Sequence, residues 1–390
     1  MESKEIVCKE DKCTGCYACY NSCPKNCISM NEDQYGFLHP IIDIDKCTNC
    51  NLCRKTCPSI NEVIYRSPKL AYAAWALDKD ERRSSTSGGA ASIFSNYILE
   101  NGGVVFGSSI EDKIIKHIKI NKKEDLIKLK GSKYVHSRIG DTYKEAKIEL
   151  ESGRNVLFIG TPCQIAGIQK YLNKDYDNLL TVDIICHGVP SQKILQDYIK
   201  ENFNQHDFDK ISFRDEDGFN FKLLKNNKVV INVPMNESLY YMGFMKSLFY
   251  NEACYSCPYA TEKRISDITI GDFWGLGEER PFKYDKREGV SLILPNTEKG
   301  SILVDKCKNK MFLEERNISE ALNGNDQLRR PSIKYKKYDL FRKLYIKQGF
   351  NYAAMKSLRV DIYKYKIKTI LKKNKFIFKI VKKVRNSGKR

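Results

Sequence analysis

The chain lacks the features that mark secreted and membrane-spanning proteins. No apolar run among its 390 residues approaches the ~20 residues that a membrane-spanning helix needs. The first five residues are charged and contain no apolar core, so we expect no secretory signal. Low-complexity sequence is absent apart from a basic C-terminal stretch, and the only internal repeat is one cysteine motif. We therefore expect a cytoplasmic protein, at most peripheral to the inner face of the membrane.

The excess of positive charge is unevenly distributed. The net charge is +19, from 67 Lys and Arg against 48 Asp and Glu. Residues 361–390 alone contain twelve Lys and Arg and one acid, so the rest of the chain is only mildly basic. A nucleic-acid-binding protein would present a basic surface on its folded body, and this distribution argues against that class.

Cysteine is abundant, with fifteen residues, ten of which lie in the first 57 positions. Such usage favours a reducing compartment, because eight of the ten form two runs of one motif rather than a disulfide pattern. The motif is Cys-x2-Cys-x2-Cys-x3-Cys-Pro. Its cysteines are Cys13, Cys16, Cys19 and Cys23 in one run and Cys47, Cys50, Cys53 and Cys57 in the other.

This spacing is typical of a two-cluster bacterial ferredoxin, in which the fourth cysteine of each run binds the other run's cluster. We assign Cys13, Cys16, Cys19 and Cys57 to one [4Fe–4S] cluster, and Cys47, Cys50, Cys53 and Cys23 to a second. Zinc is the main alternative, but two Cys-x2-Cys pairs would satisfy it without a third cysteine and a proline in both runs.

Elements of both secondary-structure types follow the cysteine-rich region. Residues 155–159 and 179–185 form apolar runs typical of buried strands, and residues 164–172 between them have a helical pattern. That order predicts two parallel strands joined by a crossover helix. We therefore predict an α+β protein: a bacterial-type ferredoxin domain (residues 1–66), a mixed α/β flavin- and iron–sulfur-binding domain (67–315) and a basic helical C-terminal extension (316–390).

Four further cysteines suggest a second redox site. Cys163 and Cys186 each follow a predicted parallel strand, so both should lie at the carboxyl edge of the sheet, where such folds bind ligands. Cys254 and Cys257 add two thiols at cluster-like spacing. Two interpretations remain open from spacing alone. The four thiols hold a third [4Fe–4S] cluster, or Cys163 and Cys186 are small buried side chains.

A Ser/Gly-rich stretch, residues 84–89, precedes a predicted helix. Free N–H groups and hydroxyls at such a position can bind a phosphate, although an N-cap and a turn give the same pattern. Gly131–Tyr134 and Gly160–Pro162 are ambiguous in the same way.

In their order along the chain, these segments resemble the beta-subunit family of coenzyme F420 hydrogenase and dehydrogenase, in the version with a fused N-terminal ferredoxin domain. The resemblance covers roughly residues 8–315 and is far more specific than any one motif. It rests on the two cysteine runs, Ser85–Gly89, Gly131–Tyr134, Gly160–Gln164, Cys186–Gly188, Cys254–Ala260 and Arg264–Gly275.

The resemblance implies an iron–sulfur flavoprotein with a third cluster on Cys163, Cys186, Cys254 and Cys257, and with bound FAD. The implied FAD contacts are Ser85, Thr86, Ser87, Gly88, Gly89, Gly131, Ser132, Lys133, Tyr134, Gly160, Thr161, Pro162 and Gln164. The family also includes the ferredoxin-dependent 7-hydroxymethyl chlorophyll a reductase, so membership fixes neither the substrate nor a catalytic residue.

The expected function is electron transfer between [4Fe–4S] clusters and, through FAD, a two-electron acceptor such as coenzyme F420 or another small substrate. The alternative is a non-catalytic, ferredoxin-like electron-transfer subunit of a larger redox complex. Expected partners are a redox protein or ferredoxin and the small acceptor, with no nucleic acid.

The C-terminal stretch has apolar residues at helical spacing among its lysines. A helix of this kind can lie on anionic lipid, dock on the body of the protein or contact an acidic partner. The apolar positions are Tyr363, Ile367, Ile370, Leu371, Ile377, Phe378, Val381 and Val384.

Overall fold

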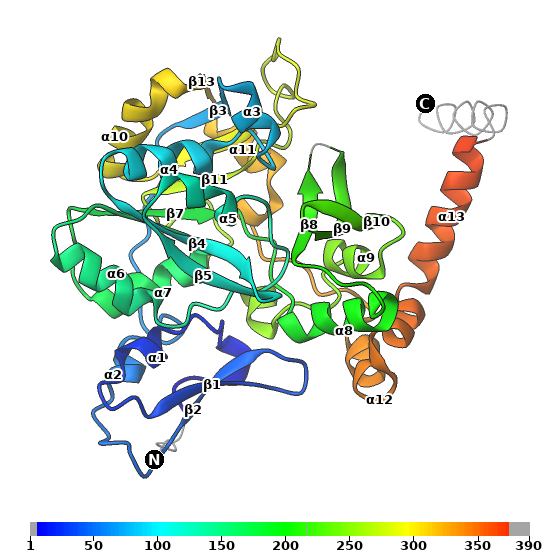
Figure 1. Ribbon diagram of the computed structural model, residues 1–390, viewed down its shortest axis with the longest axis horizontal. Helices are drawn as coiled ribbons and strands as arrows, with labels where there is room; N and C mark the ends of the chain where they lie inside the picture. The colour runs from blue at the N-terminus through cyan, green and yellow to red at the C-terminus, as the bar shows by residue number, and fades with distance from the viewer. Residues whose placement is uncertain (1–5, 216, 374–390) are drawn as a thin grey trace.

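The computed structural model describes residues 6–215 and 217–373, and its first unit is a small ferredoxin-like domain (Figure 1). Two short helices, α1 (Ala18–Ser22) and α2 (Leu52–Lys55), follow the first cysteines of each run. Strands β1 (Ile28–Glu32) and β2 (Leu38–Ile42) pair antiparallel, with Ile28 opposite Ile42. The residues between the two cysteine runs therefore form an antiparallel hairpin.

The body is built on an eight-stranded mixed sheet with the order β13-β3-β12-β11-β7-β6-β4-β5. Four neighbouring strands at its centre, β11, β7, β6 and β4, are parallel, and the remaining pairs are antiparallel. The bounds are β3 (Ala71–Ala76), β4 (Val104–Glu111), β5 (Ile114–Ile120), β6 (Val156–Gly160), β7 (Leu179–Ile184), β11 (Ile268–Asp272), β12 (Ser291–Pro295) and β13 (Met311–Arg316).

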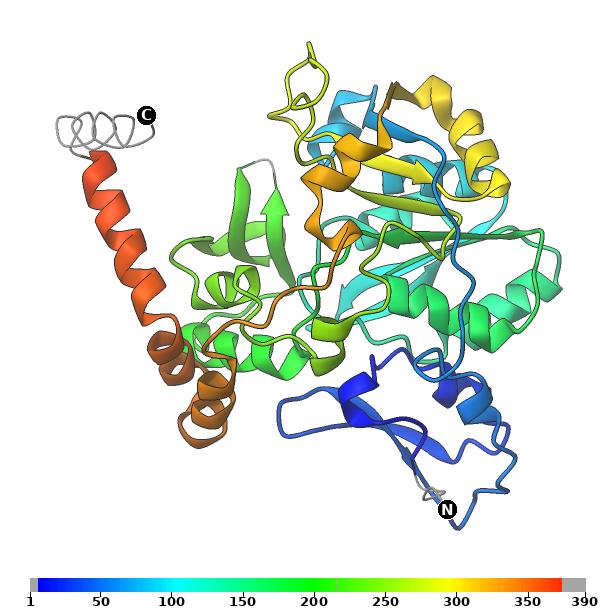
Figure 2. The same ribbon diagram turned by 180° about the vertical axis from the view of Figure 1, so that it is seen from behind.

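Helices cover both faces of this sheet (Figures 1 and 2). Val105 and Leu157 pack with α4 (Ala90–Glu100) and α10 (Glu298–Cys307) on one face. Their neighbours Val104 and Val156 pack with α6 (Thr142–Glu151) and α7 (Pro162–Leu172) on the other. Adjacent residues of a strand point to opposite faces, so the apolar runs of β4 and β6 are explained by burial on both sides.

A second unit of the body consists of a three-stranded antiparallel sheet and the helices around it. The chain crosses to it through α8 (Gln192–Phe203), forms β8 (Lys210–Asp215), β9 (Gly218–Lys225) and β10 (Lys228–Pro234), and continues into α9 (Leu239–Met245). Its core is rich in aromatic side chains, including Phe213, Phe221 and Tyr240.

The C-terminal region is helical but does not begin as a separate extension. Helix α12 (Tyr338–Ser357) buries Phe341 and Phe350 in the aromatic core of the second unit. The chain therefore leaves the body only at α13 (Arg359–Lys373), well after the predicted boundary at residue 315. Shorter elements complete the described chain: α3 (Lys79–Arg83), α5 (Leu126–Leu129), α11 (Ile318–Gly324) and the 3-10 turns at Glu10–Lys12, Lys123–Asp125, Glu252–Ser256, Lys308–Lys310 and Asp326–Leu328.

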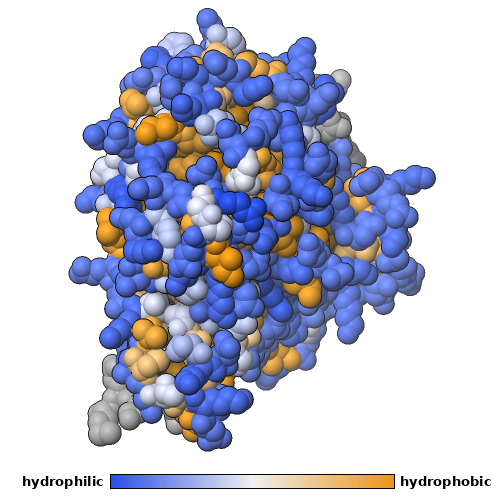
Figure 3. Space-filling model, turned by 60° about the vertical axis from the view of Figure 1, so that its left-hand side comes forward, coloured by the Kyte–Doolittle hydropathy of each residue, from blue (hydrophilic) through white to orange (hydrophobic). Residues whose placement is uncertain are grey.

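The predicted apolar stripe of the tail is only partly described. Tyr363 and Ile367 of this stripe are exposed on α13, as is the neighbouring Val360, and none of the three belongs to a described core. The other predicted positions, Ile370, Leu371, Ile377, Phe378, Val381 and Val384, lie outside the residues whose side chains are described. No helix in the described part of the chain has both the length and the apolarity that crossing a bilayer requires. On the face shown in Figure 3, apolar residues form small groups within a largely hydrophilic surface.

Candidate redox sites

The structure brings together the cysteines that sequence spacing assigns to the first cluster. The pKa of the Cys16 thiol is raised well above its usual value, first by burial and then by the charges of Cys57, Cys19 and Cys13. Cys57 comes from the other run, 38 positions after Cys19. The exchange of the fourth cysteine between the two runs is therefore present in the geometry of the chain.

The second set shows the same exchange. Burial raises the pKa of Cys53, and the charges of Cys50, Cys23 and Cys47 raise it further. Cys50 is exposed, whereas all four cysteines of the first set are buried. The first set thus faces the interior of the molecule, and the second faces solvent.

Two cysteines outside the predicted ligand sets line the same sites. Hydrogen bonds from Cys8 are the largest cause of the lowered pKa values of Cys13 and Cys57. Cys27 lies 3.2 Å from Cys23, measured between the two sulfur atoms. Sequence spacing gave no signal for either residue, because neither lies within a Cys-x2-Cys repeat. Cys307 is buried in the apolar core beside α4.

Four cysteines from three distant segments meet at the carboxyl edge of the main sheet. The pKa of Cys254 is raised well above its usual value by burial and then by Cys186, Cys257 and Cys163. Cys163 is the second residue of α7, and Cys186 follows β7. The partial positive charge at the start of α7 favours a thiolate at Cys163.

The start of α7 is fixed by a capping box. Thr161 N donates to Gln164 Oε1 over 3.0 Å, and the Thr161 side chain in turn accepts from the backbone of Gln164. The side-chain nitrogen of Gln164, Nε2, also donates to Ser137 O at 2.9 Å. The side chain of Gln164, an implied FAD contact, therefore has a structural role of its own.

The thiol sets fit clusters better than single ions. Within residues 6–215 and 217–373, no three His, Cys, Asp or Glu side chains are close enough together to hold one metal ion. The ligands of a cubane cluster bind four different irons, so they surround a larger volume than zinc ligands do. Thr14 Oγ1, in the loop between Cys13 and Cys16, is shielded from solvent and has no hydrogen-bond partner among the described residues.

The implied FAD segments also meet at this sheet edge. The hydroxyls of Thr86 and Ser132 are 3.2 Å apart, which joins the Ser/Gly-rich stretch to the Gly131–Tyr134 loop. Ser87 Oγ is buried without a partner among the described residues. A Cβ on Gly88 would lie 2.1 Å from the carbonyl oxygen of Ala74, so this position accepts no side chain.

Lys133 is the most perturbed cation of these loops. Burial is the main cause that lowers its pKa to about 7. Its ammonium donates to the carbonyl oxygens of Leu129 and Lys130, at 2.8 and 2.9 Å. Tyr134 stacks on Phe244 of α9 instead of lying free. The loop is therefore held between the main sheet and the second unit.

Two buried or partly buried ion pairs flank the edge and were not predicted. Arg214 of β8 pairs with Asp272 at the end of β11, with 2.5 Å between Nη1 and Oδ2. Arg264 pairs with Asp183 of β7 at 3.0 Å, and both side chains are buried. The partners are 58 and 81 positions apart in the sequence, so only the fold shows that they form pairs.

Comparison with known proteins agrees with this geometry. Residues 153–321 match the family described as the C terminus of the coenzyme F420 hydrogenase/dehydrogenase beta subunit, and residues 12–61 match the 4Fe-4S dicluster domain family. The coenzyme F420 hydrogenase subunit beta of Methanococcus voltae is 24% identical over 277 residues, which cover 69% of this chain and 91% of that protein.

A solved structure gives a weaker match. A chain of the xenon-derivatised F420-reducing [NiFe] hydrogenase complex from Methanosarcina barkeri is 22% identical, with a TM-score of 0.47. The alignment covers 75% of this chain and 92% of that one. The dicluster match spans both cysteine runs, and the beta-subunit match spans Cys163, Cys186, Cys254 and Cys257.

Proposed function

Because the chain is a member of the coenzyme F420 hydrogenase/dehydrogenase beta-subunit family with a dicluster ferredoxin domain, we propose that it is an FAD- and [4Fe–4S]-dependent oxidoreductase. It passes electrons between its clusters and a two-electron acceptor, either coenzyme F420 or another small substrate. The observation that carries the proposal is the meeting of three thiol-bearing segments with the Ser/Gly-rich loops at one sheet edge.

Twelve cysteines would hold three clusters. The first takes Cys13, Cys16, Cys19 and Cys57, the second takes Cys23, Cys47, Cys50 and Cys53, and the third takes Cys163, Cys186, Cys254 and Cys257. Each [4Fe–4S] cluster exchanges one electron at a time, whereas a hydride acceptor takes two, and FAD is the group that joins these two kinds of chemistry.

The residues of this chain supply the FAD site. Ser87 Oγ and the backbone of the Ser/Gly-rich stretch are suited to phosphate oxygens, because the hydroxyl lacks a partner among the described residues. Burial lowers the pKa of Lys133 to about 7, and an anionic pyrophosphate beside its amine would favour the protonated form. The pair formed by Arg214 and Asp272 links the second unit to the sheet beside these loops.

Flavin content tests the proposal. Protein purified anaerobically and denatured with acid should release about one flavin per chain, and the isolated chain should reduce an acceptor from a panel that includes coenzyme F420. Protein that is replete in iron but releases no flavin would contradict the enzyme proposal.

A non-catalytic electron-transfer subunit is the second candidate, and the surface near the second cluster favours it. Cys50 is exposed, and Ile41, Ile44 and Leu52 present apolar side chains to solvent nearby in the sequence. Such residues suit a redox protein or ferredoxin partner. This candidate predicts clusters without flavin and without turnover by the isolated chain.

We also propose a cytoplasmic protein that contacts the membrane surface through α13. The cysteine usage suits a reducing compartment. Val360, Tyr363 and Ile367 are exposed on a helix rich in lysine, as interfacial helices require. Co-sedimentation with anionic but not neutral vesicles should weaken in the Tyr363→Ser/Ile367→Ser variant and persist in Tyr352→Ser, which alters an exposed aromatic residue of α12. Equal binding by all variants would contradict this contact.

A further inference from the structure

The ferredoxin domain meets the body through the segments that carry the first thiol set. Helix α1 lies beside α6 and α7 in both ribbon views (Figures 1 and 2). A Cβ on Gly167 of α7 would lie 3.3 Å from both the Cβ and the carbonyl oxygen of Cys16. Gly167 is about one helical turn after Cys163. The absence of a side chain at Gly167 therefore brings a ligand loop of the first set onto the helix that carries a ligand of the third.

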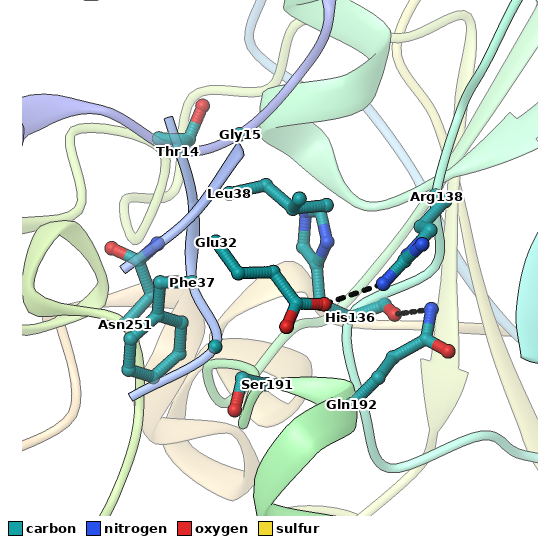
Figure 4. A pocket seen from close by; sticks show the side chains of 11 residues that line it. Thr14, Gly15, Glu32, Phe37, Leu38, His136, Arg138, Ser191, Gln192 and Asn251 are labelled. Atoms are coloured by element: carbon teal, nitrogen blue, oxygen red, sulfur yellow. Dashed lines mark hydrogen bonds and ion pairs between the residues drawn. The ribbon is translucent and has the colours of Figure 1, made fainter. Parts of the chain in front are cut away.

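The loop between Cys13 and Cys16 packs closely against the body of the protein. A Cβ on Gly15 would lie 3.3 Å from Cε1 of His136, and Figure 4 shows Thr14 and Gly15 in the loop close to this imidazole. Thr14 Oγ1 is shielded from solvent without a partner of its own. Burial raises the pKa of the Cys163 thiol, and the hydroxyl of Thr161 and, to a smaller extent, that of Thr14 oppose this shift.

Two tyrosines occupy the space between the first and third sets. The pKa of Tyr143 is raised well above its usual value by burial, and the charges of Cys16 and Cys163 raise it further. The same two cysteines, after burial, raise the pKa of Tyr259. Both side chains belong to the apolar cluster that joins the ferredoxin domain to α6 and α7. Buried aromatic side chains therefore fill the space between the first and third thiol sets.

Polar contacts hold the same interface on its outer side. Lys12 Nζ donates to Ser256 Oγ at 3.1 Å, so the residue before Cys13 reaches the turn that carries Cys254. Tyr65 Oη donates to Pro258 O, also at 3.1 Å. Both contacts tie the ferredoxin domain to the segment around Cys257, and neither involves the Cys47–Cys53 segment.

We propose that the cluster on Cys13, Cys16, Cys19 and Cys57 is the one that exchanges electrons with the third cluster. The cluster on Cys23, Cys47, Cys50 and Cys53 meets an external one-electron carrier protein. Thr14 is a positioning residue, whose unpartnered hydroxyl would donate to the Cys163 sulfur once that thiolate binds the third cluster. This inference rests on the proposed function, because it requires the third cluster.

The electron balance is simple. One electron leaves a reduced cluster, whose net charge becomes more positive by one, and enters the next cluster, whose net charge becomes more negative by one. No bond forms or breaks and no proton moves in this step. The external carrier is a one-electron donor such as a reduced ferredoxin, and the proposed flavin collects two electrons for the final acceptor.

Magnetic coupling between reduced clusters tests which cluster of the ferredoxin domain lies next to the third cluster. Neighbouring paramagnetic clusters split and broaden each other's electron paramagnetic resonance signals, whereas isolated clusters give simple spectra. Two matched variants of the full chain are reconstituted with iron and sulfide and reduced with dithionite. Cys16→Ala/Cys19→Ala removes the first cluster, and Cys47→Ala/Cys50→Ala removes the second.

We expect coupled signals from the variant without the second cluster and simple, uncoupled signals from the variant without the first. The reverse pattern would overturn the order. Iron analysis of the parent separates this failure from that of the proposed function. About twelve atoms per chain support the third cluster, and about eight would contradict the proposed function itself.

Thr14 provides a second measurement if the cysteine variants fail to fold. A hydroxyl donating to a thiolate sulfur stabilises the reduced, more negative cluster. Thr14→Val should therefore shift the midpoint potential of the third cluster to more negative values, and Thr14→Ser should restore the parent value. An unchanged potential in Thr14→Val, or a shift in the first cluster alone, would contradict the contact with Cys163.

Discussion

Arg264 and Asp183 form an ion pair in the interior of the protein, with 3.0 Å between Nη2 and Oδ1, next to the third thiol set. Burial raises the pKa of Cys186 to about 12 and of Cys257 to about 11, and the charge of Arg264 opposes both shifts. The guanidinium therefore supplies positive charge where a cluster with four thiolate ligands would be negative. Asp183 Oδ2 has no hydrogen-bond partner among the described residues.

Removal of the buried carboxylate should destabilise the fold. We expect Asp183→Asn to lower the free energy of unfolding by about 3 kcal/mol, because Arg264 would remain charged and buried without its partner. Anaerobic denaturant unfolding measures the change. Asp285→Asn is the control, because the pair of Asp285 with Arg287 is exposed, and it should unfold like the parent. A loss no larger than that of the control would contradict the role of the pair.

Loss of one ligand should empty the third site alone. We expect Cys254→Ser to lower the iron content from about twelve to about eight atoms per chain, because a four-iron cluster needs its thiolates. Cys307→Ala is the control: it also removes a buried thiol, but one outside every ligand set. Colorimetric iron analysis after anaerobic reconstitution gives the answer. Unaltered iron in Cys254→Ser would count against the third cluster.

The proposed cluster ligands could be identified in the sequence because their constraints are local. Three thiols within seven residues leave few alternatives, and the exchange of Cys23 and Cys57 follows from the duplicated motif. The strand that precedes Cys163 and the one that precedes Cys186 were visible as apolar runs, and their parallel pairing is confirmed. Parallel strands then dictate that both cysteines share one edge of the sheet.

Long-range partners could not be predicted in this way. Nothing in the local sequence of Asp183 indicates Arg264. Cys8 and Cys27 look like ordinary thiols until folding places them against ligands. Helix α12 was assigned to the C-terminal extension because the family resemblance ends near residue 315, yet Phe341 and Phe350 belong to the core. Burial of a few large side chains decides its position.

Stability should fall in weak acid because two histidines are buried in the neutral form. Burial lowers the pKa of His117 to about 4, below its unfolded value of about 6.5. Between these values the unfolded chain takes up a proton that the folded chain does not, so the free energy of unfolding falls as pH falls. Burial also lowers the pKa of His136 to about 4, so this histidine contributes to the same loss of stability.

A His117 variant isolates one of the two protons. Glutamine retains a donor for Ile159 O, which lies 3.0 Å from the imidazole Nε2. We expect His117→Gln to lose about 1 kcal/mol less stability than the parent between pH 7 and pH 5.5. Denaturant unfolding at both pH values measures this, with released iron assayed in parallel to exclude cluster loss. Identical pH dependence in both proteins would refute the assignment.

The Ser/Gly-rich stretch should govern flavin content without affecting iron. A Cβ at position 88 would lie 2.1 Å from Ala74 O and 2.7 Å from Ser291 N, and neither backbone atom can move away cheaply. We therefore expect Gly88→Ala to displace the loop and to release several-fold less flavin per chain at unchanged iron. Gly102→Ala, which strains the turn after α4 through its φ of 75° but meets no neighbouring atom, should retain flavin. Full flavin content in Gly88→Ala would move the FAD site elsewhere.

The most direct test of the whole account is the composition of protein isolated without oxygen. We predict a brown protein with about twelve iron and twelve sulfide per chain, bound flavin and paramagnetic signals after dithionite reduction. Stoichiometric zinc in a colourless protein that gives no such signals would contradict the claim that these thiols hold redox clusters.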